Sequence, residues 1–237
     1  MSGEDPPERP DFVRNIIGGL ERYNPEAAGM LEGYVQQQCE EKFCDCNANR
    51  ALLKLYQLNP DRIKDEVITN ILVKAMTQFP SSQFDQALHL LSPQVSNPGP
   101  GAASELAEAV GKLRALNAQL EGAQYARFWA TMDSDDLYAD LTTDIAGFEE
   151  MVRLRIAQLV SEAFREVPLA VLEAWLGLDE ADVTKFAVET CGWKPGPDGL
   201  FQVPRNVENE AKKSEIREDV NVNMFARVIK RSWEEAA

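Results

Sequence analysis

Residue types that commonly carry enzyme chemistry are scarce in this sequence. His89 is the only histidine, so a site with several histidine ligands is impossible and any serine triad would depend on this one residue. His89 lies beside apolar residues in ALHLLSP, which predicts a packed or half-exposed helical histidine. The four cysteines are Cys39, Cys44, Cys46 and Cys191. Their spacings fit neither a paired zinc clip nor a disulfide framework, so we expect reduced thiols, no metal site and no cofactor.

Paired carboxylates can act as a general acid and a general base, and three adjacent acidic pairs occur: Glu40–Glu41, Asp135–Asp136 and Glu149–Glu150. Neighbours in a helix point about 100° apart, so none of these pairs forms a facing dyad. Gly18-Gly19 lacks the preceding strand and the Lys-Ser/Thr of a phosphate loop. No nucleophile elbow is present. We predict that the chain is not an enzyme.

The most informative stretch is residues 167–204, which orders two short helical patterns before a turn and an apolar strand. Asp179 is placed to cap the second helix, and Gly192 follows that helix where a left-handed residue is favoured. The sequence PGPDG at 195–199 has turn chemistry, and residues 200–203 are typical of a returning strand. Helix, turn, helix and hairpin together predict a winged helix.

The charge of this predicted winged helix disfavours nucleic acid. Its second helix carries one base, Lys185, against four acids, so its net charge is 1 − 4 = −3 (Asp179, Glu180, Asp182 and Glu189). The wing adds only Lys194, which Asp198 offsets. Binding phosphates requires positive charge, and the whole chain has a net charge of −15. We therefore predict a protein-binding surface, with direct nucleic-acid binding as the alternative.

The first 91 residues show helical periodicity. One stripe contains Phe12, Ile16, Leu20 and Tyr23, and the next predicted helix turns Met30 inward. A helix over 48–58 is apolar around most of its circumference, which predicts a central position. The sequences YNPE at 23–26 and LNPD at 58–61 recur 35 residues apart, each predicting an Asn cap and a helix begun by Pro. This interval is near that of paired-helix repeats, so we expect a helical-repeat domain.

Beyond residue 91 the helical pattern is interrupted once and then resumes. Residues 92–104 contain three prolines and two glycines and are predicted to be a loop. A long helix from about Asp144 should join the helical array to the winged helix. We therefore divide the chain into a disordered lead-in at 1–10, a helical domain at 11–147, and a winged-helix domain with a C-terminal helix at 148–237.

The C-terminal helix combines an apolar stripe with bases that group elsewhere on its surface. The stripe consists of Met224, Phe225, Val228, Ile229 and Trp233. It either packs on its own domain or binds a partner helix. The bases are Arg227, Lys230 and Arg231. They form either a solvated face or an RNA contact.

Several short motifs, in their order and spacing, resemble one known family over about residues 12–205. They are RYNPE at 22–26, LLKLYQLNP at 52–60, FW at 128–129, GFE at 147–149 and CGW at 191–193. The family comprises subunit K of eukaryotic translation initiation factor 3 and the eighth subunits of the COP9 signalosome and the proteasome regulatory particle. The resemblance implies a HEAT-like helical domain followed by a winged helix, a PCI-like architecture dominated by helices.

The same resemblance implies a function. It implies a non-catalytic scaffold subunit of the initiation factor, pairing especially with subunit L and indirectly with the small ribosomal subunit that engages mRNA. A scaffold subunit of the signalosome or of the proteasome lid is the related alternative. The chain has no apolar run long enough to span a bilayer, and its acidic, proline-rich start is unlike a signal peptide. We expect a cytoplasmic or nuclear protein without a membrane partner.

Overall fold

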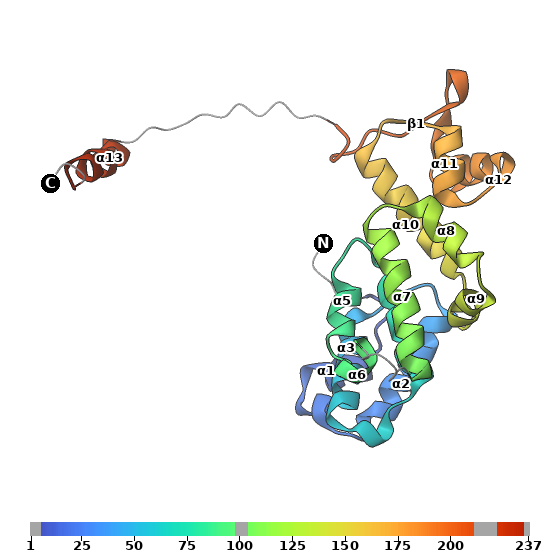
Figure 1. Ribbon diagram of the computed structural model, residues 1–237, viewed down its shortest axis with the longest axis vertical. Coiled ribbons are helices and arrows are strands. Elements are labelled where there is room, and N and C mark those ends of the chain that lie inside the picture. Colours follow the sequence, from blue (N-terminus) through green and yellow to red (C-terminus); the bar gives the residue numbers. More distant parts are fainter. Residues whose placement is uncertain (1–5, 98–103, 211–221, 235–237) are drawn as a thin grey trace.

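The computed structural model describes residues 6–97, 104–210 and 222–234, and these are mostly helical with one small sheet (Figure 1). The helices before the sheet are α1 (Asp11–Gly18), α2 (Ala27–Glu40), α3 (Cys46–Leu58), α4 (Asp65–Met76), α5 (Gln83–Leu88), α6 (Pro93–Ser96), α7 (Glu105–Glu121), α8 (Tyr125–Met132), α9 (Asp136–Thr142) and α10 (Phe148–Ala163). Short 3-10 turns lie at η1 (Leu20–Tyr23) and η2 (Pro60–Arg62). We call residues 6–163 the helical body. None of the described helices is long and apolar enough to cross a membrane.

Helix α4 is central to the helical body. It packs against α2, α3, α5, α7 and α9, and Ile71, Leu72 and Val73 are fully buried. Helix α3 also lies inside, between α1, α2, α4 and α5, as the sequence predicted for residues 48–58. Its last residue is an exception, because Leu58 is exposed at the helix end.

The two Asn-Pro motifs do not begin helices in the same way. Asn24 accepts a hydrogen bond from the Glu26 backbone N–H at 3.1 Å, and α2 begins directly afterwards. Asn59 instead donates to the Leu55 carbonyl at 2.9 Å and so closes α3. Pro60 opens a 3-10 turn, and α4 begins only at Asp65. The two motifs therefore share their punctuation but not their local structure.

The predicted N-terminal stripe is only partly buried. Val13 and Ile16 face the core, whereas Phe12, Leu20 and Tyr23 are exposed. For Leu20 and Tyr23 the physical reason is that α1 ends at Gly18 and a separate 3-10 turn follows, so one helical period does not continue through residue 23. The prediction that Met30 points inward is also wrong, because its side chain is 48% exposed.

Helix α10 leads from the helical body to the sheet (Figure 1). Gly147 precedes it with φ +67°, so α10 begins a few residues after the predicted start near Asp144. The next elements are β1 (Glu166–Pro168), α11 (Leu169–Leu176), α12 (Glu180–Lys185), a π-helical turn η3 (Phe186–Thr190), β2 (Lys194–Pro195), a 3-10 turn η4 (Pro197–Gly199) and β3 (Leu200–Gln202). We call residues 166–203 the sheet module.

The sheet has three antiparallel strands in the order β1-β3-β2. Phe201 in the central strand pairs with Val167 on one side and Pro195 on the other. The predicted hairpin is therefore present, but the sequence did not indicate β1, because three residues are too few for an alternating pattern. The predicted helix ends are confirmed: Asp179 accepts from the Asp182 N–H at 3.0 Å, and Gly192 has φ +68°.

The helical body and the sheet module meet at Trp129. Its indole Nε1 donates to the Trp175 carbonyl at 2.8 Å, and the Arg153 guanidinium lies 4.6 Å from the centre of the Trp129 ring. Arg153 also donates to the Leu176 carbonyl at 2.9 Å. Gly177 has φ +60°, and a Cβ at this position would lie 2.7 Å from the Trp129 ring. Only glycine fits this contact without displacement.

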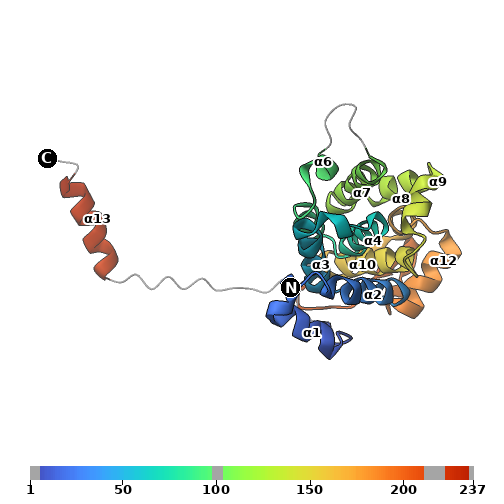
Figure 2. The same cartoon turned by 90° about the horizontal axis from the view of Figure 1, so that it is seen from below.

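The final helix, α13 (Val222–Glu234), lies apart from the rest of the molecule in both views (Figures 1 and 2). Of the predicted lead-in, residues 1–5 lie outside the described residues, and Arg9 is buried at 5% exposure. Parts of the predicted loop at 92–104 and of the segment before α13 also lie outside them.

Candidate interaction surfaces

The side chains considered for catalysis are on the surface. His89 is exposed, and its Nδ1 lies 2.6 Å from the Asp85 carbonyl oxygen. The three acidic pairs are exposed too, and several members have structural partners. Asp135 caps α9, and the hydrogen bond from the Leu137 N–H, together with nearby Lys112, lowers its pKa. The described residues contain no group of three or more His, Cys, Asp or Glu side chains that could hold a metal ion.

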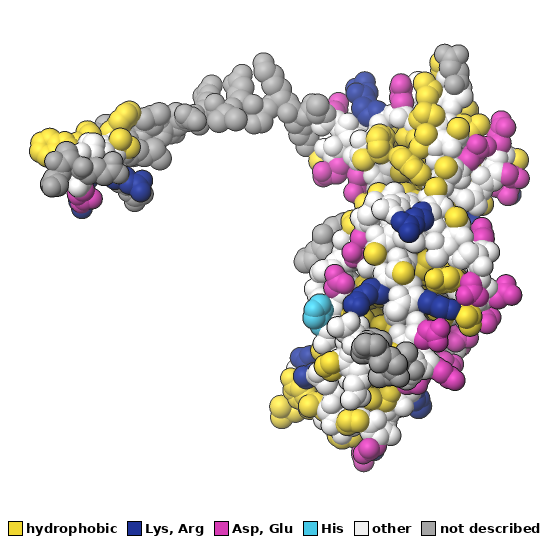
Figure 3. Space-filling model, viewed as in Figure 1, with side chains coloured by type: hydrophobic (Ala, Val, Ile, Leu, Met, Phe, Trp, Pro, Cys, Tyr) yellow, Lys and Arg dark blue, Asp and Glu magenta, His cyan; other side chains and the backbone are white. Residues whose placement is uncertain are grey.

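The acidic surface predicted for the sheet module is present. The four acids of α12 and its flanks are exposed, and so is Lys185. Figure 3 shows acidic side chains gathered on the side of the module where α12 lies. Because carboxylates repel phosphate, this face does not suit a nucleic-acid backbone.

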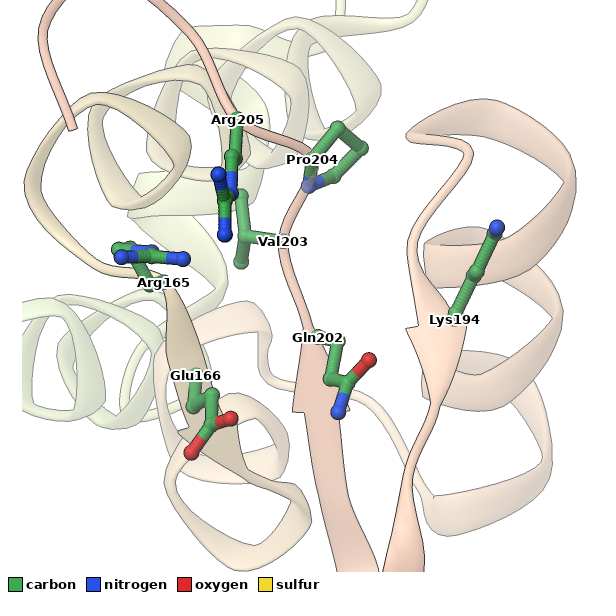
Figure 4. A pocket seen from close by; sticks show the side chains of 7 residues that line it. All are labelled: Arg165, Glu166, Lys194, Gln202, Val203, Pro204 and Arg205. Atoms are coloured by element: carbon green, nitrogen blue, oxygen red, sulfur yellow. The ribbon is translucent and has the colours of Figure 1, made fainter. Parts of the chain in front are cut away.

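A hollow of about 700 Å³ lies along the sheet module. It is lined by Arg165, Glu166, Lys194, Gln202, Val203, Pro204 and Arg205. Figure 4 shows Arg165 and Arg205 extending toward the same space on one side of β3, while Lys194 projects from the other side. Arg205 also lies 3.6 Å from a Glu210 carboxylate oxygen.

Sequence reasoning missed this basic hollow. Arg165 and Arg205 are far apart in the chain, and the two segments come together because the Val203 N–H donates to the Arg165 carbonyl at 2.9 Å. The sequence could have indicated the hollow only if the strand that pairs with the returning strand had been recognised. That strand, β1, was not predicted. The sheet module therefore has both an acidic face and a basic hollow.

Helix α13 exposes its apolar stripe. Phe225 is 56%, Val228 68%, Ile229 54% and Trp233 75% exposed. These positions recur at helical spacing and share one face, and the same spacing places Lys230 and Arg231 away from it. Figure 3 shows the apolar and the basic side chains of α13 on different sides of the helix. Lys230 is 3.9 Å from the Glu234 carboxylate. The side chains of Met224 and Arg227, which belong to the predicted stripe and basic group, lie outside the described residues.

A second apolar surface lies at the other end of the molecule. Leu20 is 90% exposed, and Phe12 and Tyr23, from the same part of the chain, are about half exposed. They come from α1 and η1, which pack together and onto α2. Figure 3 shows apolar side chains gathered at this lower end. The apolar residue types were evident from the sequence but their exposure was not, and for Leu20 and Tyr23 it follows from the end of α1 at Gly18.

These features define a class of protein: a helical body joined to a small helix-and-sheet module, with exposed apolar surfaces and no catalytic cluster among the described residues. Comparison with known proteins assigns this class to a family. Residues 62–215 match the CSN8/PSMD8/EIF3K family. The chain belongs to this family, and within it to the group of eukaryotic translation initiation factor 3 subunit K.

Similar proteins share nearly the whole length of the chain. Eukaryotic translation initiation factor 3 subunit K of Neurospora crassa is 77% identical over 238 residues, which covers 100% of both chains. The protein of the same description from Pyricularia oryzae is 73% identical, covering 100% of this chain and 98% of its own. That of Botryotinia fuckeliana is 51% identical, covering 98% and 97%. The comparisons confirm the resemblance predicted from the sequence, and with it a translation initiation factor subunit rather than an enzyme.

Proposed function

We propose that this chain is a non-catalytic scaffold subunit of translation initiation factor 3 that acts in the cytoplasm. Its partners are other subunits of that factor, subunit L in particular, and through them the small ribosomal subunit and mRNA. Membership of the subunit K group supports a place for this chain in that complex.

The architecture supports this proposal. Helices α2 to α5 and α7 pack on their neighbours in the manner of a HEAT-like helical domain. The order α11, α12, β2 and β3, with β1 pairing to β3, supports the assignment of a winged helix. We infer a PCI-like subunit from the two together, with the boundary near residue 147, where α10 begins.

One observation carries the mode of binding: the exposed apolar face of α13. Large apolar side chains that are more than half exposed along one helical face are costly to leave in water, and burying each one contributes roughly 1.5–3 kcal/mol. Phe225, Val228, Ile229 and Trp233 therefore form the surface that docks on a partner subunit, with the bases of the opposite face at the rim.

The test is recovery of initiation factor subunits from cytosolic extract by the full chain. We expect Phe225→Ser and Trp233→Ser together to reduce recovery of neighbouring subunits, whereas Lys230→Ser and Arg231→Ser, on the opposite face, leave it largely intact. Equal recovery by both variants would refute docking through the stripe. Failure of the wild-type chain to recover any initiation factor subunit would refute the scaffold function itself.

Direct nucleic-acid binding is the second candidate, and the basic hollow is the observation that favours it. Arg165, Lys194 and Arg205 could contact phosphates, as could Arg227, Lys230 and Arg231 on α13. Titration of single-stranded RNA at several salt concentrations decides this point. If RNA binds through the hollow, its affinity should fall steeply with salt and be lost when Arg165 and Arg205 are changed to Glu. If binding is lost only on charge reversal of Arg227, Lys230 and Arg231, the contact lies on α13.

A further inference from the structure

Cys44 and Cys46 lie side by side at the start of α3. Their Sγ atoms are 3.5 Å apart, because the chain bends at the intervening Asp45 (φ −106°, ψ 86°). Both residues are half-buried. A disulfide has an S–S length of about 2.05 Å, so the two sulfurs need to approach by roughly 1.5 Å.

The surroundings of Cys46 favour a thiolate. It is the first residue of α3, where the free backbone N–H groups and the helix dipole stabilise negative charge. Arg50, one turn further on, donates to the neutral side chains of Asn47, Gln83 and Gln86. None of these acceptors neutralises the guanidinium, so its positive charge acts on Cys46.

The two thiols are therefore chemically unequal. The hydrogen bond that Cys46 shares with Cys44, helped by Arg50, lowers the pKa of Cys46 against the opposing effects of burial and of the Asp45 carboxylate. The same hydrogen bond, together with burial, raises the pKa of Cys44 well above its usual value. One member of the pair is suited to attack as a thiolate, and the other keeps its proton at neutral pH.

The remaining cysteines provide an internal comparison. Burial raises the pKa of Cys39 to about 11, and its side chain is 0% exposed. Burial also raises the pKa of Cys191 to about 11, although this thiol is half-buried like the pair. Among the described residues, neither of these cysteines forms a hydrogen bond with another cysteine. Cys191 is thus a control thiol that is as buried as the pair but is not favoured as a thiolate.

We propose that Cys44 and Cys46 form a reversible modification site, a dithiol that hydrogen peroxide oxidises to an intramolecular disulfide. The Cys46 thiolate attacks one peroxide oxygen, the O–O bond breaks, and the departing hydroxide takes a proton from solvent to become water. This leaves a sulfenic acid on Cys46. The Cys44 sulfur then attacks the Cys46 sulfur, the S–O bond breaks, and the hydroxyl leaves with the Cys44 proton as a second water. The two thiols lose two electrons, and peroxide gains them.

This site is separate from the surfaces proposed to bind partner subunits. In a reducing cytosol the dithiol is the resting form, and cytosolic thiol reductants return the disulfide to it. The disulfide would form across Asp45, whose carboxylate caps α3 and pairs with Arg9. Oxidation therefore acts on the bend that connects α2 to α3.

The test exposes the reduced full chain to hydrogen peroxide and maps its cysteines by mass spectrometry. We expect the peptide containing Cys44 and Cys46 to lose the mass of two hydrogen atoms first, and dithiothreitol to restore it. Cys44→Ser should stop the reaction at a sulfenic acid that dimedone captures on Cys46. In Cys46→Ser, the remaining Cys44 thiol should be oxidised at least about tenfold more slowly than the wild-type pair, and Cys191→Ser should leave oxidation of the pair unchanged.

A further variant, Arg50→Gln, keeps both thiols and a side chain that can still hydrogen-bond to Asn47, Gln83 or Gln86, but it removes the positive charge. It should slow the reaction of Cys46 several-fold if the guanidinium charge activates the thiolate, with circular dichroism confirming that each variant is folded. Oxidation of Cys191 or Cys39 as fast as the pair, disulfides only between two chains, or four intact thiols in the wild-type chain would each overturn the proposal.

Discussion

At the scale of single residues, the carboxylate of Asp45 joins several segments of the chain. It receives two hydrogen bonds from Arg9, at 2.5 and 2.7 Å, and a third from the Tyr34 hydroxyl at 3.2 Å. It also caps α3 by accepting from the Ala48 N–H at 3.0 Å. Burial of Tyr34, together with the Asp45 carboxylate beside it, raises the pKa of Tyr34. Asp45 therefore holds together the first segment, α2 and α3.

Asp45→Ala should lower the free energy of unfolding by about 3–5 kcal/mol, because it leaves the Arg9 guanidinium buried without its counter-charge and removes a helix cap. Urea unfolding followed by circular dichroism measures this loss. Arg14→Ala is the control, since its ion pair with Asp11 is exposed, and we expect no change in the urea midpoint. Equal midpoints for all three chains would contradict the central role of Asp45.

Lys74 gives a prediction for pH. It is fully buried, burial lowers its pKa from 10.5, and its ammonium donates to the Glu41 carbonyl at 2.9 Å with Cys39 and Cys44 nearby. Between the lowered pKa and 10.5, the unfolded chain binds a proton that the folded chain has lost. The stability of the wild type relative to Lys74→Met should therefore rise with pH in that interval and be constant below it. Urea unfolding of both proteins at neutral and alkaline pH checks the sign, and a difference that falls with pH would contradict it.

At the scale of elements, the contact between the helical body and the sheet module depends on few groups. Trp175 contacts Tyr125 edge-on with ring centres 6.2 Å apart, and Phe164 at 5.8 Å. Trp129 and Arg153 add the hydrogen bonds to the end of α11. Because these groups come from α8, α10 and α11, they fix the module against the body.

Gly177→Ala tests this contact, and Gly192→Ala is its matched control. Both glycines have positive φ, but only at Gly177 does an added Cβ meet another group, the Trp129 ring. Both variants carry the conformational cost of about 1 kcal/mol, and Gly177→Ala should lose roughly 1–3 kcal/mol more through the steric conflict. Differential scanning calorimetry measures both losses. Equal losses would mean that the ring moves aside freely.

Much of the fold followed from local patterns, and the exceptions have physical causes. The second helix of the module was predicted with both ends because Asp179 and Gly192 act within their own helix. Strand β1 was not predicted, because its pairing with β3 is a long-range contact that three residues cannot signal. The basic hollow was missed for the same reason. Leu20 was predicted to belong to an apolar helical stripe but is exposed, because periodicity indicates which residues share a face and not whether another element covers that face.

At the scale of the whole molecule, α13 makes the chain asymmetric. Its apolar side chains are more than half exposed, and it lies apart from the helical body and the sheet module (Figure 2). A chain ending at Glu210 should therefore keep the melting temperature of the full chain, because no described contact in the body or module is lost. It should also recover fewer partner subunits. A fall of several degrees in the melting temperature would show instead that the last segment stabilises the body.

The burial of Arg9 has a consequence for turnover of the protein. A protease that removed the first nine residues would take away the cation that faces Asp45 while leaving that carboxylate enclosed. Such a shortened chain would open more often and be degraded sooner, since degradation follows the population of opened molecules. The integrity of a few leading residues thus sets how long the protein persists in the cell.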